Sequence, residues 1–289
     1  MGKIVVIGSI NMDISTELHD LPQIGETIKG SNVGISPGGK GANQAVAAAK
    51  LGGDVMMVGM IGDDAFGADA LANLNSHCID VTNVWTVSET TGLAMILREN
   101  GDNRIIVAPG ANNAWPDELP LETIIANASI LLLQNEIPFT VTEKAVDIAR
   151  LYDVPTIFDP APVDQFPLSF LRKITYLTPN ETEFKQLPED ILQDETKAVL
   201  VTQGKNGVEV HDESGVNHVS AFPVDVADST GAGDTFNGAF AVALTSGKTV
   251  QDAVQDAVAF ANQAAALSTT KIGAQTGMPK LSEIEESGT

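Results

Sequence analysis

The sequence has little cysteine, few basic residues and no long apolar segment, and each shortage excludes a class of protein. A single cysteine, Cys78, cannot form an intrachain disulfide, so we expect a reducing, cytoplasmic compartment. Sixteen lysines and arginines stand against 38 acidic residues, and the formal net charge of −22 repels nucleic acid and anionic membranes. No apolar run approaches the ~18 residues of a membrane span. We therefore expect neither nucleic acid nor membrane as a partner.

Signals for export and for histidine-based metal binding are also missing. The chain runs directly into a strand-like segment, Lys3–Ile7, without a basic region, apolar core or cleavage site before it, so we expect no signal peptide. The four histidines, His19, His77, His211 and His218, lack metal-ligand spacing, which favours surface positions.

Two common nucleotide-binding motifs are incomplete. Gly34 and the segment Gly38-Gly-Lys-Gly41 nearly form a P-loop, but Gly41 stands where a hydroxyl for Mg²⁺ is required. The segment Gly8–Asp13 lacks the glycine spacing of a dinucleotide-binding fingerprint. A P-loop enzyme and a dinucleotide dehydrogenase are therefore disfavoured. The loop 38–43 can instead bring backbone and Asn43 close to a small polyhydroxylated ligand, or it can simply form a tight turn into a helix.

Apolar strand-like runs alternate with helical runs, which is typical of a parallel sheet with helices on its faces. The length of 289 residues is enough for a large core. The expected strands are Lys3–Ile7, Asp54–Met60, Ser129–Leu133, Pro155–Phe158, Thr175–Thr178 and Ala198–Thr202. The expected helices are Gly41–Leu51, Ala65–Ser76, Thr140–Leu151, Asp234–Ser246 and Val250–Ser268.

Two segments interrupt this alternation. Ile14–Ile35 and Thr91–Val107 have the pattern of paired strands without an intervening helix, and the second contains a turn at Asn100-Gly101-Asp102. They predict a small β-sheet inserted into the main domain. Inserted elements of this kind commonly close over active sites and exclude water.

The stretch Asp228-Ser-Thr-Gly-Ala-Gly-Asp-Thr-Phe236 carries the strongest chemical signal. Gly231, Ala232 and Gly233 leave backbone N–H groups accessible where an apolar helical pattern begins, and helix N-termini bind anions. Asp234 falls in the first turn, where it could accept a proton from a hydroxyl. The pattern favours phosphoryl transfer, although Asp234 could instead be a helix-capping acid.

Further polar residues follow predicted strands. Ligands of open α/β sheets bind beyond the carboxyl ends of the strands. Each residue alone is ordinary in a turn or cap, so their shared location is what favours a site. They are Asn11, Asp13, Asn135, Glu136, Asp159, Asn180, Glu183, Gly204 and Lys205.

Together these segments resemble the ribokinase (PfkB) family of carbohydrate kinases over essentially the whole chain. Several ordered motifs at family-like spacing are far more specific than one glycine loop. The resemblance implies an α/β fold, a Rossmann-like three-layer sandwich with a mostly parallel central sheet, as a single domain over residues 1–289 with a β-sheet lid from about 14–36 and 91–108. The motifs are Gly8-Ser-Ile-Asn-Met-Asp13, Gly38-Gly-Lys-Gly-Ala-Asn-Gln44, Gln134-Asn-Glu-Ile-Pro138, Asn180-Glu-Thr-Glu183, Thr202-Gln-Gly-Lys-Asn-Gly207, Asp228–Phe236 and Gly273-Ala-Gln275.

The resemblance also implies ATP-dependent phosphorylation of the 5-hydroxyl of D-ribose. Asp234 would be the general base, and Gly231, Ala232 and Gly233 would form an anion hole for the transferring phosphoryl group. The implied sugar contacts are Asn11, Met12, Asp13, Gly39, Lys40, Gly41, Ala42, Asn43, Glu136 and Asp234. The implied nucleotide contacts are Asn180, Thr202, Gln203, Gly204, Lys205, Asn206, Gly207, Gly233 and Asn262.

Metal ions and a partner follow from the same resemblance. Glu183 would hold Mg²⁺ through water, and a homodimer would form through the lids. A monovalent cation such as K⁺ would bind near Asp228, Thr230, Ser268, Lys271, Gly273 and Gly277. Gly277 stands where the family usually has serine, and this departure predicts altered cation affinity or dependence. Only 21 residues separate Asn180 from Thr202, which predicts a trimmed helical segment there.

Two alternatives remain. A related kinase for fructose, deoxyribose or a nucleoside would keep the loop around Asp234 and differ at the sugar contacts. A non-catalytic sugar-binding or regulatory protein is disfavoured because Asp234 and the loop glycines are all present. A panel of sugars and nucleosides, assayed for dependent ATP turnover, distinguishes these cases.

Overall fold

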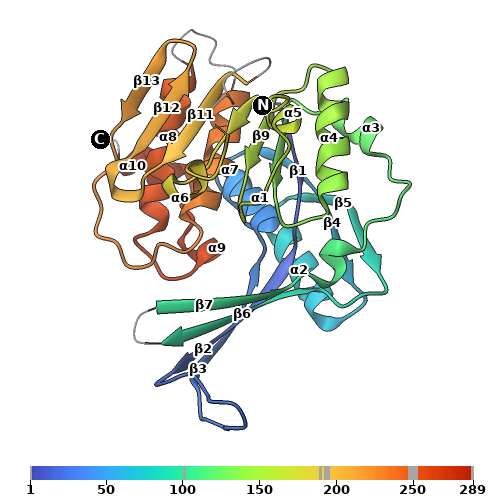
Figure 1. Ribbon diagram of the computed structural model, residues 1–289, viewed down its shortest axis with the longest axis vertical. Coiled ribbons are helices and arrows are strands. Elements are labelled where there is room, and N and C mark those ends of the chain that lie inside the picture. Colours follow the sequence, from blue (N-terminus) through green and yellow to red (C-terminus); the bar gives the residue numbers. More distant parts are fainter. Residues whose placement is uncertain (1, 100–101, 189–190, 192–195, 247–252, 288–289) are drawn as a thin grey trace.

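A nine-stranded central sheet organises the computed structural model, which describes residues 2–99, 102–188, 191, 196–246 and 253–287. Within that part of the chain the strand order is β13-β12-β11-β10-β9-β8-β1-β4-β5 (Figure 1). Every neighbouring pair from β11 to β5 is parallel, whereas β12 and β13 form an antiparallel hairpin at one edge. The strands are β1 Lys3–Ile7, β4 Asp54–Gly62, β5 Asp80–Val87, β8 Ile130–Gln134, β9 Thr156–Asp159, β10 Tyr176–Leu177, β11 Ala198–Thr202, β12 Val208–Asp212 and β13 Gly215–Val219.

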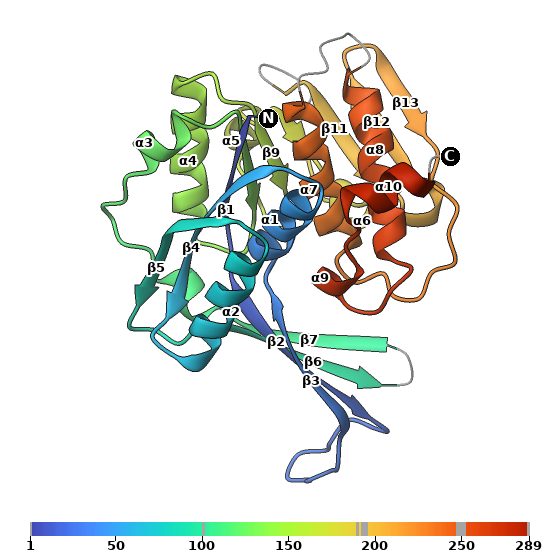
Figure 2. The same ribbon diagram turned by 180° about the vertical axis from the view of Figure 1, so that it is seen from behind.

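Helices cover both faces of this sheet, because its central strands are apolar on both sides. Alternate residues of β1 belong to different cores: Ile4 and Val6 pack into one buried cluster, Val5 and Ile7 into the other. The first cluster includes α1 Lys40–Lys50, α2 Ala65–Ser76, α7 Ala232–Thr245, α8 Ala253–Ser268 and α10 Leu281–Ser287 (Figure 2). The second includes α3 Leu121–Ile125, α4 Phe139–Leu151 and α5 Leu168–Leu171.

Short elements line the carboxyl edge of the sheet or the loops next to it. They are η1 Gly110–Asn113, α6 Glu181–Phe184, η2 Gly204–Asn206 and α9 Ala274–Gly277. The start of α1 lies directly on the turn after β1, since a Cβ on Gly41 would lie 2.7 Å from the Gly8 carbonyl carbon. Only glycine allows this approach. It brings the first residues of α1 and β2 together.

A smaller sheet of order β3-β2-β6-β7 projects from one end of the main body (Figure 1). Its strands are β2 Asn11–Leu18, β3 Ser31–Gly38, β6 Gly92–Glu99 and β7 Asp102–Ala108. The two hairpins are antiparallel, and β2 pairs with β6 in parallel. The small sheet therefore joins two segments that lie far apart in the sequence, as their patterns predict.

The fold class is confirmed, and the differences concern particular elements. The strands β5, β12 and β13 were missed. The edge strands β5 and β13 carry a weak apolar pattern, and β12, next to β13, has only two buried valines among its five residues. The strands of the small sheet extend beyond the predicted segments, to Asn11 and Gly38. Helix α8 begins at Ala253, and the predicted positions 250–252 lie outside the described residues, as do 100 and 101 of the predicted turn. The segment after Asn180 holds one helical turn, α6, before the undescribed positions. None of the described helices is long and apolar enough to span a membrane.

Candidate active site

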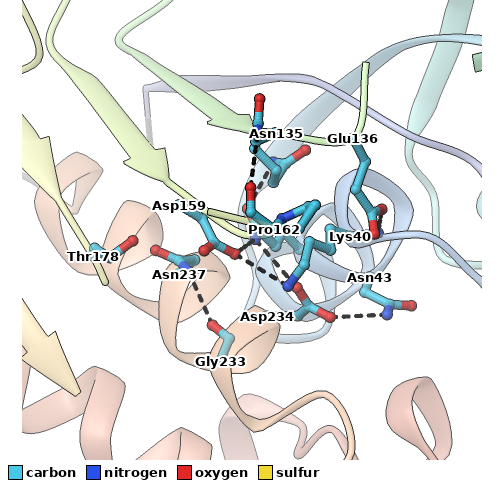
Figure 3. Close-up of polar contacts among 12 residues, drawn as sticks. Lys40, Asn43, Asn135, Glu136, Asp159, Pro162, Thr178, Gly233, Asp234 and Asn237 are labelled. Atoms are coloured by element: carbon cyan, nitrogen blue, oxygen red, sulfur yellow. Dashed lines mark hydrogen bonds and ion pairs between the residues drawn. The ribbon is translucent and has the colours of Figure 1, made fainter. Parts of the chain in front are cut away.

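Asp234 lies in the first turn of α7 and is almost fully buried, at 7% relative exposure. Both of its carboxylate oxygens accept hydrogen bonds from α1. Asn43 Nδ2 donates to Oδ2 at 2.9 Å (Figure 3). Gln44 Nε2 donates to Oδ1 at 3.2 Å. Burial raises the pKa of Asp234, while the charge of Lys40 and the two amide hydrogen bonds oppose that rise. The Asp234 side chain therefore does not cap its own helix.

A lysine and three more carboxylates surround Asp234. Lys40 Nζ lies 3.7 Å from Asp159 Oδ2. Burial raises the pKa of Asp159 to about 7, even though Lys40 opposes it. Burial also raises the pKa of Asp13 to about 6, with the charges of Glu136 and Asp234 adding to the effect. For Lys40, burial disfavours the cation, but the surrounding carboxylates outweigh burial and hold its pKa above the ordinary value. The site thus gathers four carboxylates and one lysine.

Glu136 is held in place by the start of α1 and by the turn after β1. Its Oε2 accepts from Ser9 Oγ at 2.5 Å and from the Lys40 backbone N–H at 3.0 Å. Ser9 Oγ in turn accepts from the Gly41 N–H at 3.3 Å. A carboxylate at a helix N-terminus is favoured by the free N–H groups there. Ser9 was not among the predicted site residues, although it lies within the quoted Gly8–Asp13 motif.

Asn112 is a second residue that the sequence did not reveal. It lies on η1, is 1% exposed and holds the turn before β2. Its Oδ1 accepts from the Ile10 N–H at 2.9 Å, and its Nδ2 donates to Asn11 Oδ1 at 2.6 Å. Gly92 leaves room for this pair, because a Cβ there would lie 2.2 Å from each of the two amide atoms. The amide of Asn11 therefore has a fixed orientation.

Two predicted sugar contacts have their side chains elsewhere. Met12 and Ala42 are 3% and 2% exposed and belong to the hydrophobic core. Only the backbone of these residues can face a ligand. Gly39, with φ 87°, precedes α1 and lies against the backbone of Asn11, where a Cβ would be 2.8 Å from the Asn11 nitrogen. These positions bring backbone, rather than side chains, to the site.

The glycine loop at the start of α7 leaves the N–H groups of Gly233 and Asp234 without a helical partner, whereas the Ala232 N–H donates to the Ser229 carbonyl at 3.2 Å. Gly231 is in the left-handed region, with φ 79°, and its carbonyl accepts the N–H of Thr235 at 2.8 Å. The N–H groups of Gly233 and Asp234 precede this bond, in the turn where helical amides have no partner within the helix. A Cβ on Gly233 would meet no neighbouring atom within 4 Å. The loop therefore opens toward free space with N–H groups and a helix dipole behind it.

A cavity of about 380 Å³ adjoins this loop. Six of the predicted nucleotide contacts line it: Thr202, Gly204, Lys205, Gly207, Gly233 and Asn262. Its other lining residues are mostly apolar: Val208, Ala221, Phe222, Pro223, Val224, Val226, Ser229, Ala232, Phe236, Ala265, Ala266 and Thr269. Asn180, Gln203 and Asn206 are not among the described residues that line it. An apolar pocket beside a helix N-terminus with unpaired N–H groups suits a molecule with a flat apolar end and a negatively charged end.

Asn180 and Glu183 form a capping box on α6. Asn180 Oδ1 accepts the N–H groups of Thr182 and Glu183, each at 2.9 Å, and Glu183 Oε2 accepts the Asn180 N–H at 2.8 Å. This arrangement fully accounts for their Asn-x-x-Glu spacing. One Glu183 oxygen remains for another partner, and its charge acts on Lys40 and Asp159.

The predicted cation residues form two groups. The Asp228 carboxylate closes a loop by accepting from Thr230 Oγ1 at 2.6 Å and from the Gly273 N–H at 2.9 Å. At Gly277 an added Cβ would lie 2.4 Å from the Ser268 carbonyl oxygen and 3.4 Å from that of Lys271. The side chains of these last two residues point to other partners, Ala265 and Glu283. In the described chain no group of three acidic, histidine or cysteine side chains is arranged to hold a metal ion.

The model of the pfkB family carbohydrate kinases matches residues 1–281 of this chain. The chain belongs to the PfkB family of carbohydrate kinases. A ribokinase of Lactococcus lactis is 42% identical over 99% of this chain and 96% of its own length. The crystal structure of a Thermotoga maritima ribokinase superposes with a TM-score of 0.91, at 38% identity and 99% coverage of both chains. An Arabidopsis thaliana ribokinase complexed with ribose and ATP superposes with a TM-score of 0.90, at 34% identity, covering 99% of this chain and 98% of the other.

The PfkB-family chain brings most of the residues predicted from its sequence to one edge of its central sheet. Asn11, Asp13, Lys40, Asn43 and Glu136 lie around Asp234 or contact residues that do. The nucleotide residues lie across the start of α7, and the cation residues lie behind it. The residues that were missed, Ser9, Asn112, Gln134 and the amide end of Gln44, all act by holding others. Ser9, Gln44 and Gln134 lie within the quoted motifs, and a polar glutamine at the end of the buried strand β8 is a further local signal.

Proposed function

We propose that this chain is a ribokinase, which transfers the γ-phosphoryl group of ATP to the 5-hydroxyl of D-ribose. The observation that carries the proposal is the position of Asp234. It lies buried between the Gly231–Gly233 loop, where the Gly233 N–H has no helical partner, and the polar side chains of Asp13, Asn43 and Glu136. A carboxylate at this point can accept a hydroxyl proton while the amides face the phosphoryl group. Membership of the PfkB family and the ribokinase relatives support the same reaction.

The sugar is proposed to lie between the small sheet and α1. Burial and the negative charges of Glu136 and Asp234 raise the pKa of Asp13, on β2, because burial takes water away from its carboxylate. A sugar hydroxyl that donates to Asp13 would supply the missing stabilisation. Asn11 and Asn43 offer amide groups of fixed orientation, and the backbone at Met12, Gly39, Gly41 and Ala42 allows close approach. Glu136 and Lys40 complete the proposed pocket with opposite charges.

The reaction is proposed to proceed by direct transfer along the start of α7. Asp234 takes the proton of the hydroxyl as that oxygen attacks, and it must be ionised to do so. The charge of Lys40 offsets part of the cost of a buried base. Backbone amides and the positive end of the α7 dipole stabilise charge on the phosphoryl oxygens as the bond to ADP breaks. ATP enters as its Mg²⁺ complex, and Glu183 is proposed to contact that ion through water with its remaining oxygen.

The nucleotide is proposed to occupy the 380 Å³ cavity with its apolar base away from the loop. Thr202, Gly204, Lys205, Gly207 and Asn262 line that cavity, and Gly233 marks its phosphate end. Three predicted contacts that do not line it adjoin residues that do. Asn180 pairs with Thr202, the Gln203 N–H donates to the Gly207 carbonyl at 2.8 Å, and the Asn206 N–H donates to the Gln203 carbonyl at 3.0 Å. Their role in the proposal is therefore to hold the cavity rather than to contact the base.

A monovalent cation is proposed to bind through backbone oxygens behind the anion loop. The Asp228 carboxylate already accepts from the N–H and hydroxyl of Thr230 and from the N–H of Gly273, so carbonyl groups are the available ligands. The Ser268 and Lys271 carbonyls both face Gly277. Carbonyl oxygens suit K⁺, which such groups can bind in place of its hydration shell. When bound, the cation would add positive charge near the loop that receives the phosphoryl group.

The small sheet is proposed to act as a lid on one catalytic domain and as the surface of a homodimer. A row of directly opposed side chains crosses all four strands: Ile35, Ile14, Met95 and Ile106. All four side chains are large and apolar, and three of them are exposed: Ile35 by 58%, Met95 by 40% and Ile106 by 53%. An exposed apolar row of this extent favours association with another surface. A second copy offers the same row.

Release of ADP in the presence of single sugars tests the proposal. We expect turnover that depends on D-ribose and falls when fructose or a nucleoside replaces it. Replacing ribose by 2-deoxyribose should lower kcat/KM by a factor that corresponds to about 1–3 kcal/mol of activation free energy, the cost of one unpaired buried polar group. Asp13→Ala should lower ribose use and narrow the gap between ribose and 2-deoxyribose. Sugar-independent ATP hydrolysis, or preference for another acceptor, would overturn the assignment.

A further inference from the structure

Two lines of buried amides end on the carboxylate of Asp234. The first comes from α9: Gln275 Nε2 donates to Asn43 Oδ1 at 2.9 Å, and Asn43 Nδ2 donates to Asp234 Oδ2 at 2.9 Å. Gln275 itself accepts at Oε1 from Asn73 Nδ2 of α2 at 2.8 Å. Asn43 and Gln275 are 7% and 9% exposed, so water does not readily replace these partners. Three amides thus connect the half-buried surface of α2 to one oxygen of the carboxylate.

The second line comes from the end of β8. Gln134 Nε2 donates to Gln44 Oε1 at 2.7 Å, and Gln44 Nε2 donates to Asp234 Oδ1 at 3.2 Å. The same Gln44 nitrogen also donates to Asp159 Oδ2 at 2.9 Å. Gln44 and Gln134 have no exposed surface. Each oxygen of Asp234 therefore faces an amide whose other end is already held.

An amide has a donor end and an acceptor end, so its direction matters. An ionised carboxylate only accepts hydrogen bonds, and it is stabilised when Asn43 presents its NH₂ group. If that amide turned over, its carbonyl oxygen would face the carboxylate and repel it. The turn is opposed by Gln275, because its own NH₂ group needs the Asn43 carbonyl as acceptor. Asn73 fixes Gln275 in the same way.

We propose that Gln275 is a positioning residue of the active site: it holds the Asn43 amide with its NH₂ group toward Asp234 and thereby favours the ionised base. The proposal rests on the proposed function, in which Asp234 accepts the proton of the sugar hydroxyl. It gives the Gly273-Ala-Gln275 segment a task distinct from cation binding. Asn73, on α2, extends that task to a residue with no contact to Asp234, ribose or ATP.

The charges around Asp234 determine the sign of the effect. Lys40 of α1 is the cation that favours its ionisation, whereas Glu136 after β8, Asp159 at the end of β9 and Asp13 of β2 disfavour it. Burial already raises the pKa of Asp234. Loss of the Asn43 donor removes one stabilising contact to the ionised form, so the carboxyl stays protonated to higher pH. The acid limb of kcat/KM, which reports groups of the free enzyme, should then move upward.

Gln275→Met tests this directly, because methionine keeps the length of the side chain and loses both ends of the amide. We expect its acid limb to move up by about one pH unit, the effect of one hydrogen bond to a charged group. Asn73→Asp tests the direction of the line from its outer end. An ionised aspartate cannot donate a hydrogen bond, so the Gln275 amide must turn over to donate to it. The Gln275 oxygen then faces Asn43, whose amide must turn over as well and present its oxygen to Asp234. We expect a shift in the same direction.

Asn75→Asp is the matched control. It adds the same charge to the same helix, at an exposed residue whose amide donates only to the Leu71 carbonyl. Its pH profile should coincide with that of the unmodified chain, as should that of Thr276→Ala, the exposed neighbour of Gln275 on α9. Thermal unfolding of every variant separates loss of fold from loss of ionised base. If Gln275→Met does not fold, the pH profile of Asn73→Asp, at a half-buried position, tests the positioning role instead.

The outcomes separate the two proposals. If the unmodified chain does not phosphorylate ribose, the proposed function fails. If it does phosphorylate ribose, the acid limb of kcat/KM decides the positioning role. That role is wrong if folded Gln275→Met keeps the original acid limb, or if Asn73→Asp keeps it where Gln275→Met does not fold. An equal shift in Asn75→Asp also overturns it, because added charge would then explain the result.

Discussion

Replacement of Asp234 by asparagine tests the proposed base with almost no change in shape. The two carboxylate oxygens accept from Asn43 and Gln44, at 2.9 and 3.2 Å. Asparagine has only one acceptor oxygen, so one of these donors would face its NH₂ group. The substitution therefore removes a buried charge and one buried hydrogen bond at the same time.

These two losses act in opposite directions on stability. An unpaired buried donor costs about 1–3 kcal/mol. The raised pKa of Asp234 means that burial disfavours its ionised form, so removal of the charge returns part of that cost. The net change in the free energy of unfolding should stay within about 2 kcal/mol. Loss of general-base catalysis should instead lower kcat by about 10²–10⁴, which is roughly 3–5 kcal/mol of activation free energy.

The assay is ADP release at saturating ribose and ATP, together with thermal unfolding with and without ribose. Asp234→Asn should unfold near the temperature of the unmodified chain and should still be protected by ribose. Asp225→Asn makes the same chemical change at an exposed residue nine positions earlier in the chain and should leave turnover unchanged. A folded Asp234→Asn protein with near-normal turnover would refute the assignment of the base.

Three further changes test the surroundings of Asp234. Gly233→Val should fold but lose turnover, because a Cβ there meets no neighbouring atom within 4 Å and would enter the space proposed for the phosphate; normal turnover would contradict the proposed anion loop. Gly231→Val should instead lower the melting temperature, because Gly231 has a φ of 79°. Asp13→Asn should raise the free energy of unfolding at pH 8 by about 1–3 kcal/mol and hardly change it at pH 3.5. The Asp13 carboxyl has a pKa of about 6 in the folded chain and 3.8 in the unfolded chain, so it lowers stability progressively as the pH rises through this range. Denaturant titration at pH 8 and pH 3.5 measures the two free energies of unfolding, and an equal gain at both would contradict the reasoning. Gly277→Ser should lower the melting temperature, because its Cβ would lie 2.4 Å from the Ser268 carbonyl oxygen; unchanged stability with stronger dependence on K⁺ would show that the loop accommodates the serine.

The sequence by itself determined the fold class and the place of the site. Apolar runs such as Lys3–Ile7 and Ser129–Leu133 predict strands buried on both faces, and their residues do pack into two separate cores. Gly231 and Asp234 are informative because the conformation of a glycine loop and the first turn of a helix depend mainly on local sequence. Local rules also predicted a small sheet from Ile14–Ile35 and Thr91–Val107, although they did not specify that β2 pairs with β6 in parallel.

Tertiary structure decided which side chains meet. Asn43 and Gln275 are 232 positions apart, yet they form one hydrogen bond beside Asp234. No local pattern reveals such a contact, because it depends on the packing of α9 against α1. Tertiary packing also buried Met12 in the core and left the weakly patterned β13 at an edge of the sheet. Periodicity reports which face of an element is apolar, whereas the direction of a buried amide is set by the partner that the completed fold places at its other end.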